Sequence, residues 1–211
     1  MDNQPQAGDL LDSSVRGFAS AVAAKTPTPG GGSVAGVVGS MAVALGEMSL
    51  NFTLGKKKYA QHEPVLKHLS GRLMHARSMF QDLVADDMAA YGLYREASGM
   101  ADGPEKDAAV QLALAAAINV PREMAKLALA VLEDFVALSD KCNTYLISDL
   151  VAGAALLAAT VDLCDYNVRV NVPQLNDGTA ADDVRLASRG DVQKAYALKV
   201  AIEQAAAPQI G

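Results

Sequence analysis

Residues 26–50 read TPTPGGGSVAGVVGSMAVALGEMSL, a turn rich in proline and glycine followed by a long apolar segment. Pro27 and Pro29 prevent a continuous helix through the turn, and the three glycines permit backbone angles that are closed to other residues. The apolar segment, residues 34–50, is shorter than the roughly 20 residues of a membrane span, and its small side chains suit close helix packing. We therefore expect the buried central helix of a soluble bundle, which could also form part of a subunit interface. Ser33 would cap this helix, and it would end near Gly55.

The composition of the whole chain also favours helices. Of the 211 residues, 51% are hydrophobic and only 5% aromatic, and alanine, the best helix former, is abundant. Valine and isoleucine do not alternate with polar residues in short runs bounded by turns, as they would in strands. No linker rich in Pro, Gly and Ser divides the middle of the chain. These features predict an all-α fold, a single-domain helical bundle over residues 1–211.

Apolar residues at helical spacing predict five further helices. Pro121 lies inside one of them and is expected to kink or divide it near Asn119, because proline lacks the N–H that the helix needs. Lys56 is expected to begin a loop, and residues 98–103 and 176–178 are expected to form turns. The five predicted helices cover residues 10–24, 64–97, 104–138, 143–173 and 181–206.

Charge and cysteine usage narrow the class of protein. The formal net charge of -6 argues against a nucleic-acid partner, which requires a basic face. Cys142 and Cys164 lie in apolar helical stretches, so they are expected to be buried, reduced thiols rather than a disulfide framework. The first residues, MDNQPQAGDLLDSS, are polar and acidic, unlike a secretory signal. We expect a cytoplasmic protein that binds neither nucleic acid nor membrane.

The glycine run has two open interpretations. Gly30 to Ala35 fits the loose pattern G-x-G-x-x-A, but a dinucleotide site needs a strand before the run, and here a helix and a proline-rich turn precede it. A P-loop is excluded because no Lys-Ser or Lys-Thr pair follows. The run then either holds an anion or a carbonyl oxygen at a helix N-terminus, or lets helices pack closely without any ligand.

Acidic side chains fall where the helical period predicts a core. Asp87 lies on an apolar stripe beside Tyr91, whereas Asp86 falls closer to solvent. On a later helix Asp149 shares a face with Leu146 and Leu150. A buried carboxylate is costly unless it is paired or hydrogen-bonded, so these residues predict either a polar pocket inside the bundle or structural ion pairs.

Amide side chains occur at related positions. Asn167 and Asn171 are one helical turn apart, Asn119 stands at the Pro121 break, and Asn143 begins a predicted helix. The structural alternative is capping, with Asn143 as an N-cap and Asn171 as a C-terminal cap.

Lysines and histidines complete the candidate polar groups. The run Lys56 to Lys58 is a solvated turn, a set of cations for an acidic substrate tail, or the source of one lysine in the pocket. His62, His68 and His75 lack metal-ligand spacing, so no metal site is expected. Ser33 has no histidine nearby in sequence, so a nucleophilic triad has no support.

Several of these motifs occur together in one family. The chain contains Thr28-Pro-Gly-Gly-Gly-Ser-Val-Ala, Lys56-Lys-Lys-Tyr59, Asp87 with Tyr91, Asn119-Val-Pro121, Asn143 with Asp149, and Tyr166-Asn-Val-Arg-Val-Asn171. In this order they resemble the formiminotransferase-cyclodeaminase C-terminal family, over about residues 10–206. The resemblance implies an all-helical homodimer or larger homo-oligomer with a folate pocket near its subunit contacts.

The resemblance implies two candidate reactions. A cyclohydrolase adds water to the bridge carbon of 5,10-methenyltetrahydrofolate and gives 10-formyltetrahydrofolate, whereas a cyclodeaminase closes formiminotetrahydrofolate to the methenyl form and releases ammonia. The sequence carries no formiminotransferase domain, which favours the cyclohydrolase. Hydrolysis moves no electrons, so no redox cofactor or metal is expected beside the tetrahydrofolate substrate.

The roles expected for the site residues follow from the charge of the methenyl bridge, which is a delocalised cation. Asp87 or Asp149 would stabilise this cation and accept a proton from water, and Lys57 would place the water or protonate the leaving nitrogen. The remaining candidates would bind the pterin, the developing oxyanion and the glutamate tail. They are Thr28, Pro29, Gly30, Gly31, Gly32, Ser33, Asn51, Lys56, Lys58, Tyr59, Tyr91, Asn119, Asn143, Asn167 and Asn171.

A different class of function is also compatible with the sequence. The polar core residues would then only set the register of the helices in a non-enzymatic interaction protein, which would bind no folate.

Overall fold

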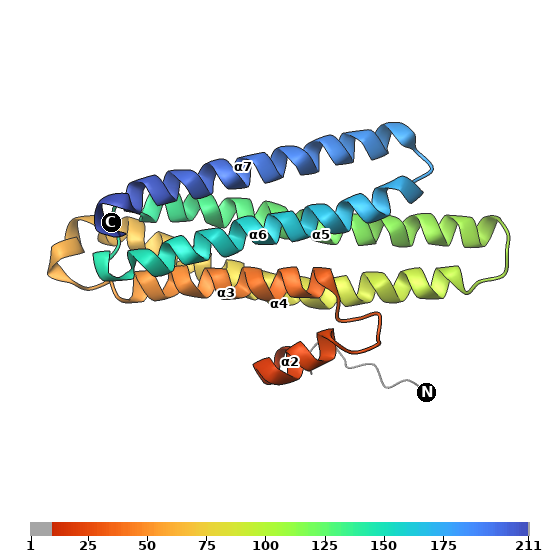
Figure 1. The fold of residues 1–211 in the computed structure, drawn as a ribbon, viewed down its shortest axis with the longest axis horizontal. Helices are drawn as coiled ribbons and strands as arrows, with labels where there is room; N and C mark the ends of the chain where they lie inside the picture. Colours follow the sequence, from red (N-terminus) through yellow and green to blue (C-terminus); the bar gives the residue numbers. More distant parts are fainter. Residues whose placement is uncertain (1–9, 211) are drawn as a thin grey trace.

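The computed structural model describes residues 10–210, and the regular secondary structure within that range is all helical. The polar start of the chain, on which the expectation of no secretory signal rests, falls mostly outside the described residues. Four long helices form the main bundle, a fifth covers one side of it, and a short helix precedes them (Figure 1). The α-helices are α2 (Val15–Val22), α3 (Gly31–Asn51), α4 (Glu63–Ser98), α5 (Pro104–Leu138), α6 (Ile147–Asn171) and α7 (Gly178–Ile210).

Three short 3-10 helices join the long ones: η1 (Lys57–His62) leads into α4, η2 (Thr144–Leu146) leads into α6, and η3 (Val172–Gln174) ends it. Within the bundle, α3 packs against α4 and α6, and α5 packs against α4 and α6 on the opposite side. The last helix, α7, lies along α6 and α5 (Figure 1). This arrangement confirms the predicted all-α bundle.

Glycines on α3 let aromatic side chains approach its backbone. A Cβ atom added at Gly39 would lie 2.5 Å from Cε1 of Phe80, which is fully buried. Gly46 and, on α6, Gly153 face the ring of Phe135 in the same way. The small residues of the 26–50 segment are therefore packing positions, as close helix packing requires.

The prediction that α3 is buried all round is wrong. One face packs on α4 and α6, but the other is open, and Met41 on it is 49% exposed. The reason is topological: α3 stands at a corner of the four-helix arrangement and has only two close neighbours. An apolar helix with an exposed face points to a further contact outside the single chain.

Several boundaries also differ from the predicted ones. The helix predicted for residues 10–24 is replaced by the shorter α2, because Ser14 caps it by accepting a hydrogen bond from Gly17 N–H. Lys57 begins η1 rather than a loop. Pro121 lies inside one uninterrupted helix, so the predicted division near Asn119 is wrong. The last helix is longer than predicted at both ends.

Two helical segments are long and apolar enough to cross a membrane by length and composition: Gly31–Asn51 and Thr144–Gln174. About half of each is buried inside the bundle. Core helices of soluble proteins pass the same test, so this finding is weak evidence for a membrane location.

Candidate functional site

A carboxylate on α4 meets the first turn of α3. The Ser33 hydroxyl donates a hydrogen bond of 2.8 Å to Oδ2 of Asp87, and the Ser33 backbone N–H also interacts with this carboxylate. Asp87 is half-buried, whereas Asp86 is exposed, as the helical period predicts. Asp87 therefore faces the interior, at the N-terminal end of α3.

The environment of Asp87 has opposing effects on its ionisation. Burial raises the pKa of the Asp87 carboxyl above its ordinary value, while the hydrogen bonds from Ser33 lower it in part. Cys164 on α6 lies in the same neighbourhood. Burial, reinforced by the charge of Asp87, raises the pKa of its thiol to about 12. Cys164 is thus an unreactive side chain beside the site, as expected for a buried thiol.

The glycines of the turn leave room for two polar side chains. A Cβ atom added at Gly32 would overlap the Asp87 carboxylate, since it would lie 2.6 Å from Cγ. At Gly31 the nearest atom would be Nδ2 of Asn167, at 3.5 Å. Asp87 and Asn167 thus reach neighbouring positions over the same turn from two different helices.

Asn167 and Asn171 form a short chain of amides along the end of α6. Asn167 Nδ2 donates to the Leu163 carbonyl at 2.8 Å, and Asn171 Nδ2 donates to the Asn167 carbonyl at 3.0 Å. Asn171 also reaches the Ala117 carbonyl on α5, at 3.4 Å. Asn171 is tied to the backbone of two helices, whereas the side-chain amide of Asn167 lies over Gly31 of the turn.

The prediction that Ser33 caps α3 is wrong, because the helix begins at Gly31 and Gly30 occupies the N-cap position. Gly30 has no side chain with which to satisfy the first N–H groups, and Asp87 takes this function from α4. The proposed role of the turn as a hole for a developing oxyanion conflicts with this arrangement, since a protein carboxylate already lies there. The turn therefore accommodates the Asp87 carboxylate.

A second group of candidate residues lies at the other end of α3. Asn143 caps η2 by accepting a hydrogen bond from Tyr145 N–H, and its Nδ2 donates to the Phe52 carbonyl at 3.2 Å. Its own backbone N–H donates to Thr53 Oγ1 at 2.8 Å. The structural alternative for Asn143, a helix cap, is therefore confirmed. Asp149 is half-buried in the first turn of α6.

The two groups do not meet within one chain. Ser33 and Asn51 are separated by most of the length of α3, about 27 Å at the rise of an α-helix. Within one chain, the second group therefore does not lie beside the glycine turn. Its members are Asn51, Lys56, Lys57, Lys58, Tyr59, Asn143 and Asp149.

The remaining candidates stay near the first group or lie apart. Thr28 and Pro29 are buried at the entrance to α3, and Tyr91 is half-buried one helical turn after Asp87. Asn119 is exposed, and its Oδ1 accepts a hydrogen bond from Arg122 at 3.4 Å. Asn119 faces a groove between α4 and α5 that does not contain Asp87.

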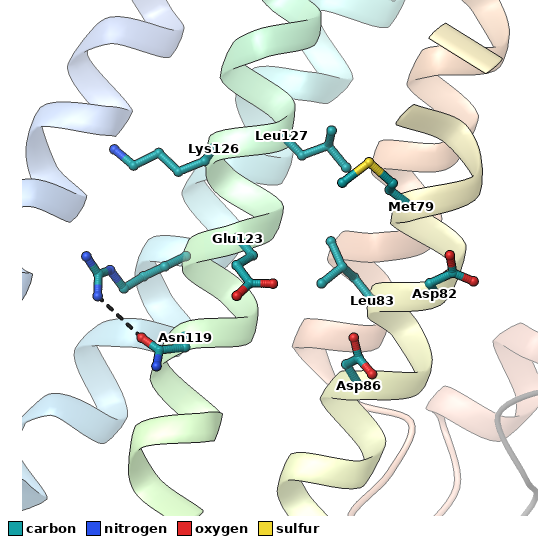
Figure 2. Close-up of a pocket in the computed structure, with 9 residues that line it drawn as sticks. Met79, Asp82, Leu83, Asp86, Asn119, Glu123, Lys126 and Leu127 are labelled. Atoms are coloured by element: carbon teal, nitrogen blue, oxygen red, sulfur yellow. Dashed lines mark hydrogen bonds between the residues drawn. The ribbon is translucent and has the colours of Figure 1, made fainter. Parts of the chain in front are cut away.

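This groove has a volume of about 820 Å³ (Figure 2). Its apolar side chains are Met79, Leu83 and Leu127, and Figure 2 shows Asp86 and Glu123 on opposite sides of it. Neither carboxylate accepts a hydrogen bond from any residue between positions 10 and 210, so no partner fixes its orientation. A catalytic group needs fixed geometry, which favours Asp87.

Two residues of the sites escaped the sequence patterns. Thr53 is fully buried, and its Oγ1 accepts a hydrogen bond from the Asn143 backbone N–H. In the sequence it is marked only as a threonine that follows the end of an apolar helix. Cys164 was expected to be buried, but its proximity to Asp87 depends on tertiary structure.

Comparisons with known proteins agree with the fold and with the sequence motifs. Residues 14–189 match the formiminotransferase-cyclodeaminase family. The chain is 33% identical to the methenyltetrahydrofolate cyclohydrolase of Methylorubrum extorquens over 173 residues, which cover 79% of this chain and 82% of that protein. It is 30% identical to the formimidoyltransferase-cyclodeaminase of Dictyostelium discoideum over 80% of this chain, but spans only 31% of that longer protein.

A solved structure shares nearly the whole fold. The formiminotetrahydrofolate cyclodeaminase of Thermotoga maritima superposes with a TM-score of 0.88 and 27% sequence identity, over 96% of this chain and 100% of that one.

Proposed function

The chain belongs to the formiminotransferase-cyclodeaminase family, and on that premise we propose that it hydrolyses 5,10-methenyltetrahydrofolate to 10-formyltetrahydrofolate. The observation that carries this proposal is the half-buried carboxylate of Asp87, held by Ser33 beside the amide of Asn167. A cationic amidine is stabilised by a fixed carboxylate in a partly desolvated place, and the same carboxylate serves as a general base.

The chemistry balances with water as the only co-substrate. Water adds to the bridge carbon while the Asp87 carboxylate accepts one of its protons, and the positive charge of the bridge is lost. The bond from this carbon to N5 then breaks, N5 takes up a proton, and the carbon stays on N10 as the formyl group. One water is consumed and one proton is released. We assign the proton delivery to N5 to Lys57.

The functional unit in our proposal is a homodimer formed through α3 and α6. These two helices pack side by side (Figure 1) and carry apolar stripes that are exposed or only partly buried within the chain. On α3, Val34, Met41 and Met48 recur every seven residues, the spacing of helices that pair. A matching exposed row at the same interval runs along η2 and α6 and consists of Tyr145, Ala152, Ala159 and Tyr166.

A two-fold dimer through this face would join the two groups of site residues. In an isologous contact the same patch meets itself. With the axis perpendicular to α3 near its middle, the start of α3 in one copy faces the end of α3 in the other. Asp87 and Asn167 of one chain would then lie close to Lys57, Asn143 and Asp149 of the second copy. The separation of about 27 Å within one chain is what makes this arrangement necessary.

A cyclodeaminase activity is the second candidate. The solved Thermotoga maritima protein is a formiminotetrahydrofolate cyclodeaminase, and this chain covers all of it. A cyclodeaminase chain of this size without a formiminotransferase domain therefore exists, which removes the domain argument that favoured the cyclohydrolase. The cyclohydrolase stays first because the identity to the Methylorubrum extorquens protein is higher, 33% against 27%.

We also propose action in the cytoplasm without a membrane or nucleic-acid partner, since the bundle core and the dimer face together account for the apolar surfaces of α3 and α6. The proposal is tested with purified protein and 5,10-methenyltetrahydrofolate, by following the loss of the methenyl chromophore. A rate no higher than that of buffer eliminates the cyclohydrolase. A parallel assay with formiminotetrahydrofolate, in which ammonia is measured, separates the two enzymes. The absence of both activities, without thermal stabilisation by either folate, would favour the non-enzymatic interaction protein.

A further inference from the structure

The two oxygens of the Asp87 carboxylate make different contacts with the start of α3. Ser33 binds one carboxylate oxygen, Oδ2, at 2.8 Å. The other oxygen, Oδ1, is the carboxylate atom that lies closest to Gly32, and the Ser33 backbone N–H also interacts with the carboxylate. Ser33 thus anchors one carboxylate oxygen, and Gly32 makes room for the other.

Two adjacent glycines of the turn differ sharply in what surrounds them. The position of a Cβ atom at Gly32 is already taken by the Asp87 carboxylate. At Gly31 the same atom would lie in ordinary van der Waals contact with Asn167, at 3.5 Å from Nδ2. Both glycines have ordinary helical backbone angles, so only the space at Gly32 requires the absence of a side chain. The contact with Asp87 therefore requires glycine at position 32.

We propose that Ser33 and Gly32 are positioning residues for the reaction: Ser33 fixes Oδ2, and Gly32 leaves the space in which Oδ1 lies, so that together they hold the carboxylate in place for the substrate cation. This inference rests on the proposed function, because it assigns Asp87 as the group that touches the substrate. Neither positioning residue reacts itself. Ser33 sets the orientation and the basicity of the Asp87 carboxylate, and Gly32 sets the position of that carboxylate.

The chain offers a matched control for the loss of the Ser33 hydroxyl. Ser188 on α7 donates a hydrogen bond of 2.7 Å to Oδ1 of Asp165 on α6. Both residues of this pair are buried, and the pair also links two helices. Removal of the Ser188 hydroxyl therefore has a comparable structural effect far from Asp87 in the sequence. The Ser188→Ala variant therefore distinguishes a general loss of stability from an effect on the reaction.

The test for Ser33 is the pH dependence of kcat/KM with 5,10-methenyltetrahydrofolate. Ser33→Ala removes a donor to the charged form of Asp87, so the acidic limb of its profile should move to higher pH. Its rate should fall about ten-fold or more at the acidic end and recover at higher pH. Ser188→Ala should keep the acidic limb at its wild-type position. An acidic limb unmoved in Ser33→Ala would overturn the proposal.

The test for Gly32 compares two alanine variants of the same turn. Gly32→Ala should lower kcat about 100-fold with little change in KM, because it displaces the base by roughly an ångström. Gly31→Ala should lose less, since its methyl group meets Asn167 at contact distance. Equal losses in the two variants would overturn the assignment of Gly32.

A readout without turnover separates failure of this inference from failure of the proposed function. The Asp87 carboxyl is followed by carbon NMR in protein labelled at aspartate, with Asp87→Asn used to assign its signal. Its titration midpoint should rise in Ser33→Ala, whether or not the protein acts on a folate. A midpoint equal to that of the wild type would overturn the role of Ser33. Wild-type protein without activity would remove only the proposed function.

Discussion

Ser33 donates a hydrogen bond of 2.8 Å to Asp87 across 54 residues of sequence, so a carboxylate of α4 takes the place of the side-chain cap that α3 lacks. The contact has two consequences for the energy of the fold. It satisfies donors at the start of α3, and it holds a charge in a half-buried place. In its effect on the carboxyl itself, burial outweighs the hydrogen bonds from Ser33, so the pKa of Asp87 is raised.

Asp87→Asn should abolish turnover and leave the fold intact. Asparagine keeps an oxygen that accepts the Ser33 hydroxyl but cannot act as a base, so kcat should fall by about 10²–10⁴-fold. At neutral pH the free energy of unfolding should not fall, because the buried charge is gone. Steady-state kinetics and urea denaturation at one protein concentration measure both. A turnover equal to that of the wild type would show that Asp87 is not the catalytic base.

The stability difference between Asp87→Asn and the wild type should depend on pH. The folded pKa of Asp87 lies above its ordinary value of 3.8, so the native state binds the extra proton between these two values. Stability of the wild type therefore decreases as pH rises through this window and levels off above it. The variant lacks this titration, and its relative stability should increase from about pH 4 toward neutral pH. Urea denaturation at several pH values checks this, and a constant difference would contradict it.

Activity should survive treatment with a chelator. Addition of water to the amidinium carbon transfers no electrons, and the carbon already carries positive charge without a Lewis acid. The methenyl assay is run before and after dialysis against EDTA, with and without added Zn²⁺ or Mg²⁺. A loss restored by one of these ions would show that a metal takes part.

The helices and the inward direction of Asp87 were predictable because both depend on local periodicity. Residues 104–138 were predicted as one helical region, and α5 runs from Pro104 to Leu138. Pro at the first helical position and an apolar stripe mark these limits. The proline inside the helix was misleading, since a long helix packed on three neighbours tolerates the loss of one backbone hydrogen bond.

The construction of the site was less predictable because it depends on contacts between distant parts of the chain. Ser33 resembles an N-cap by residue type, but its hydroxyl bonds to Asp87 instead of a local N–H. The need for Gly32 appears only when Asp87 is placed beside it. Asp87 meets the start of α3, whereas Asp149 follows Leu146, whose carbonyl accepts a hydrogen bond from Ser49 near the end of α3. Motif order along the chain does not report this separation.

Gly39→Ala should destabilise the fold although alanine is the better helix former. The new methyl group would lie 2.5 Å from the Phe80 ring in a filled core, so we expect a loss of about 1–3 kcal/mol. Gly71→Ala on α4 is the control, since nothing lies within 4 Å of its Cβ, and it should stabilise by about 0.5–1 kcal/mol. Urea denaturation measures both variants. Equal effects of the two substitutions would contradict the packing of α3 against Phe80.

The shared site predicts that two inactive variants restore each other. Asp87→Asn and Asp149→Asn should each be weakly active as homodimers. After mixing and exchange of subunits, half of the dimers are mixed, and each mixed dimer has one intact site, which gives about a quarter of the wild-type rate. If Asp149→Asn alone keeps full activity, or if the mixture gains nothing over its components, the arrangement across two copies is wrong.

A chain with both substitutions provides the control for subunit exchange. Mixed 1:1 with the wild type, it should leave about a quarter of the wild-type rate if each site combines Asp87 of one chain with Asp149 of the other, because mixed dimers then have no intact site. If each site is built from a single chain, about half of the rate remains, since every wild-type chain keeps its own site. The separation of Ser33 from Asn51 along α3 predicts the lower value. A result near one half would show that each site is built from a single chain.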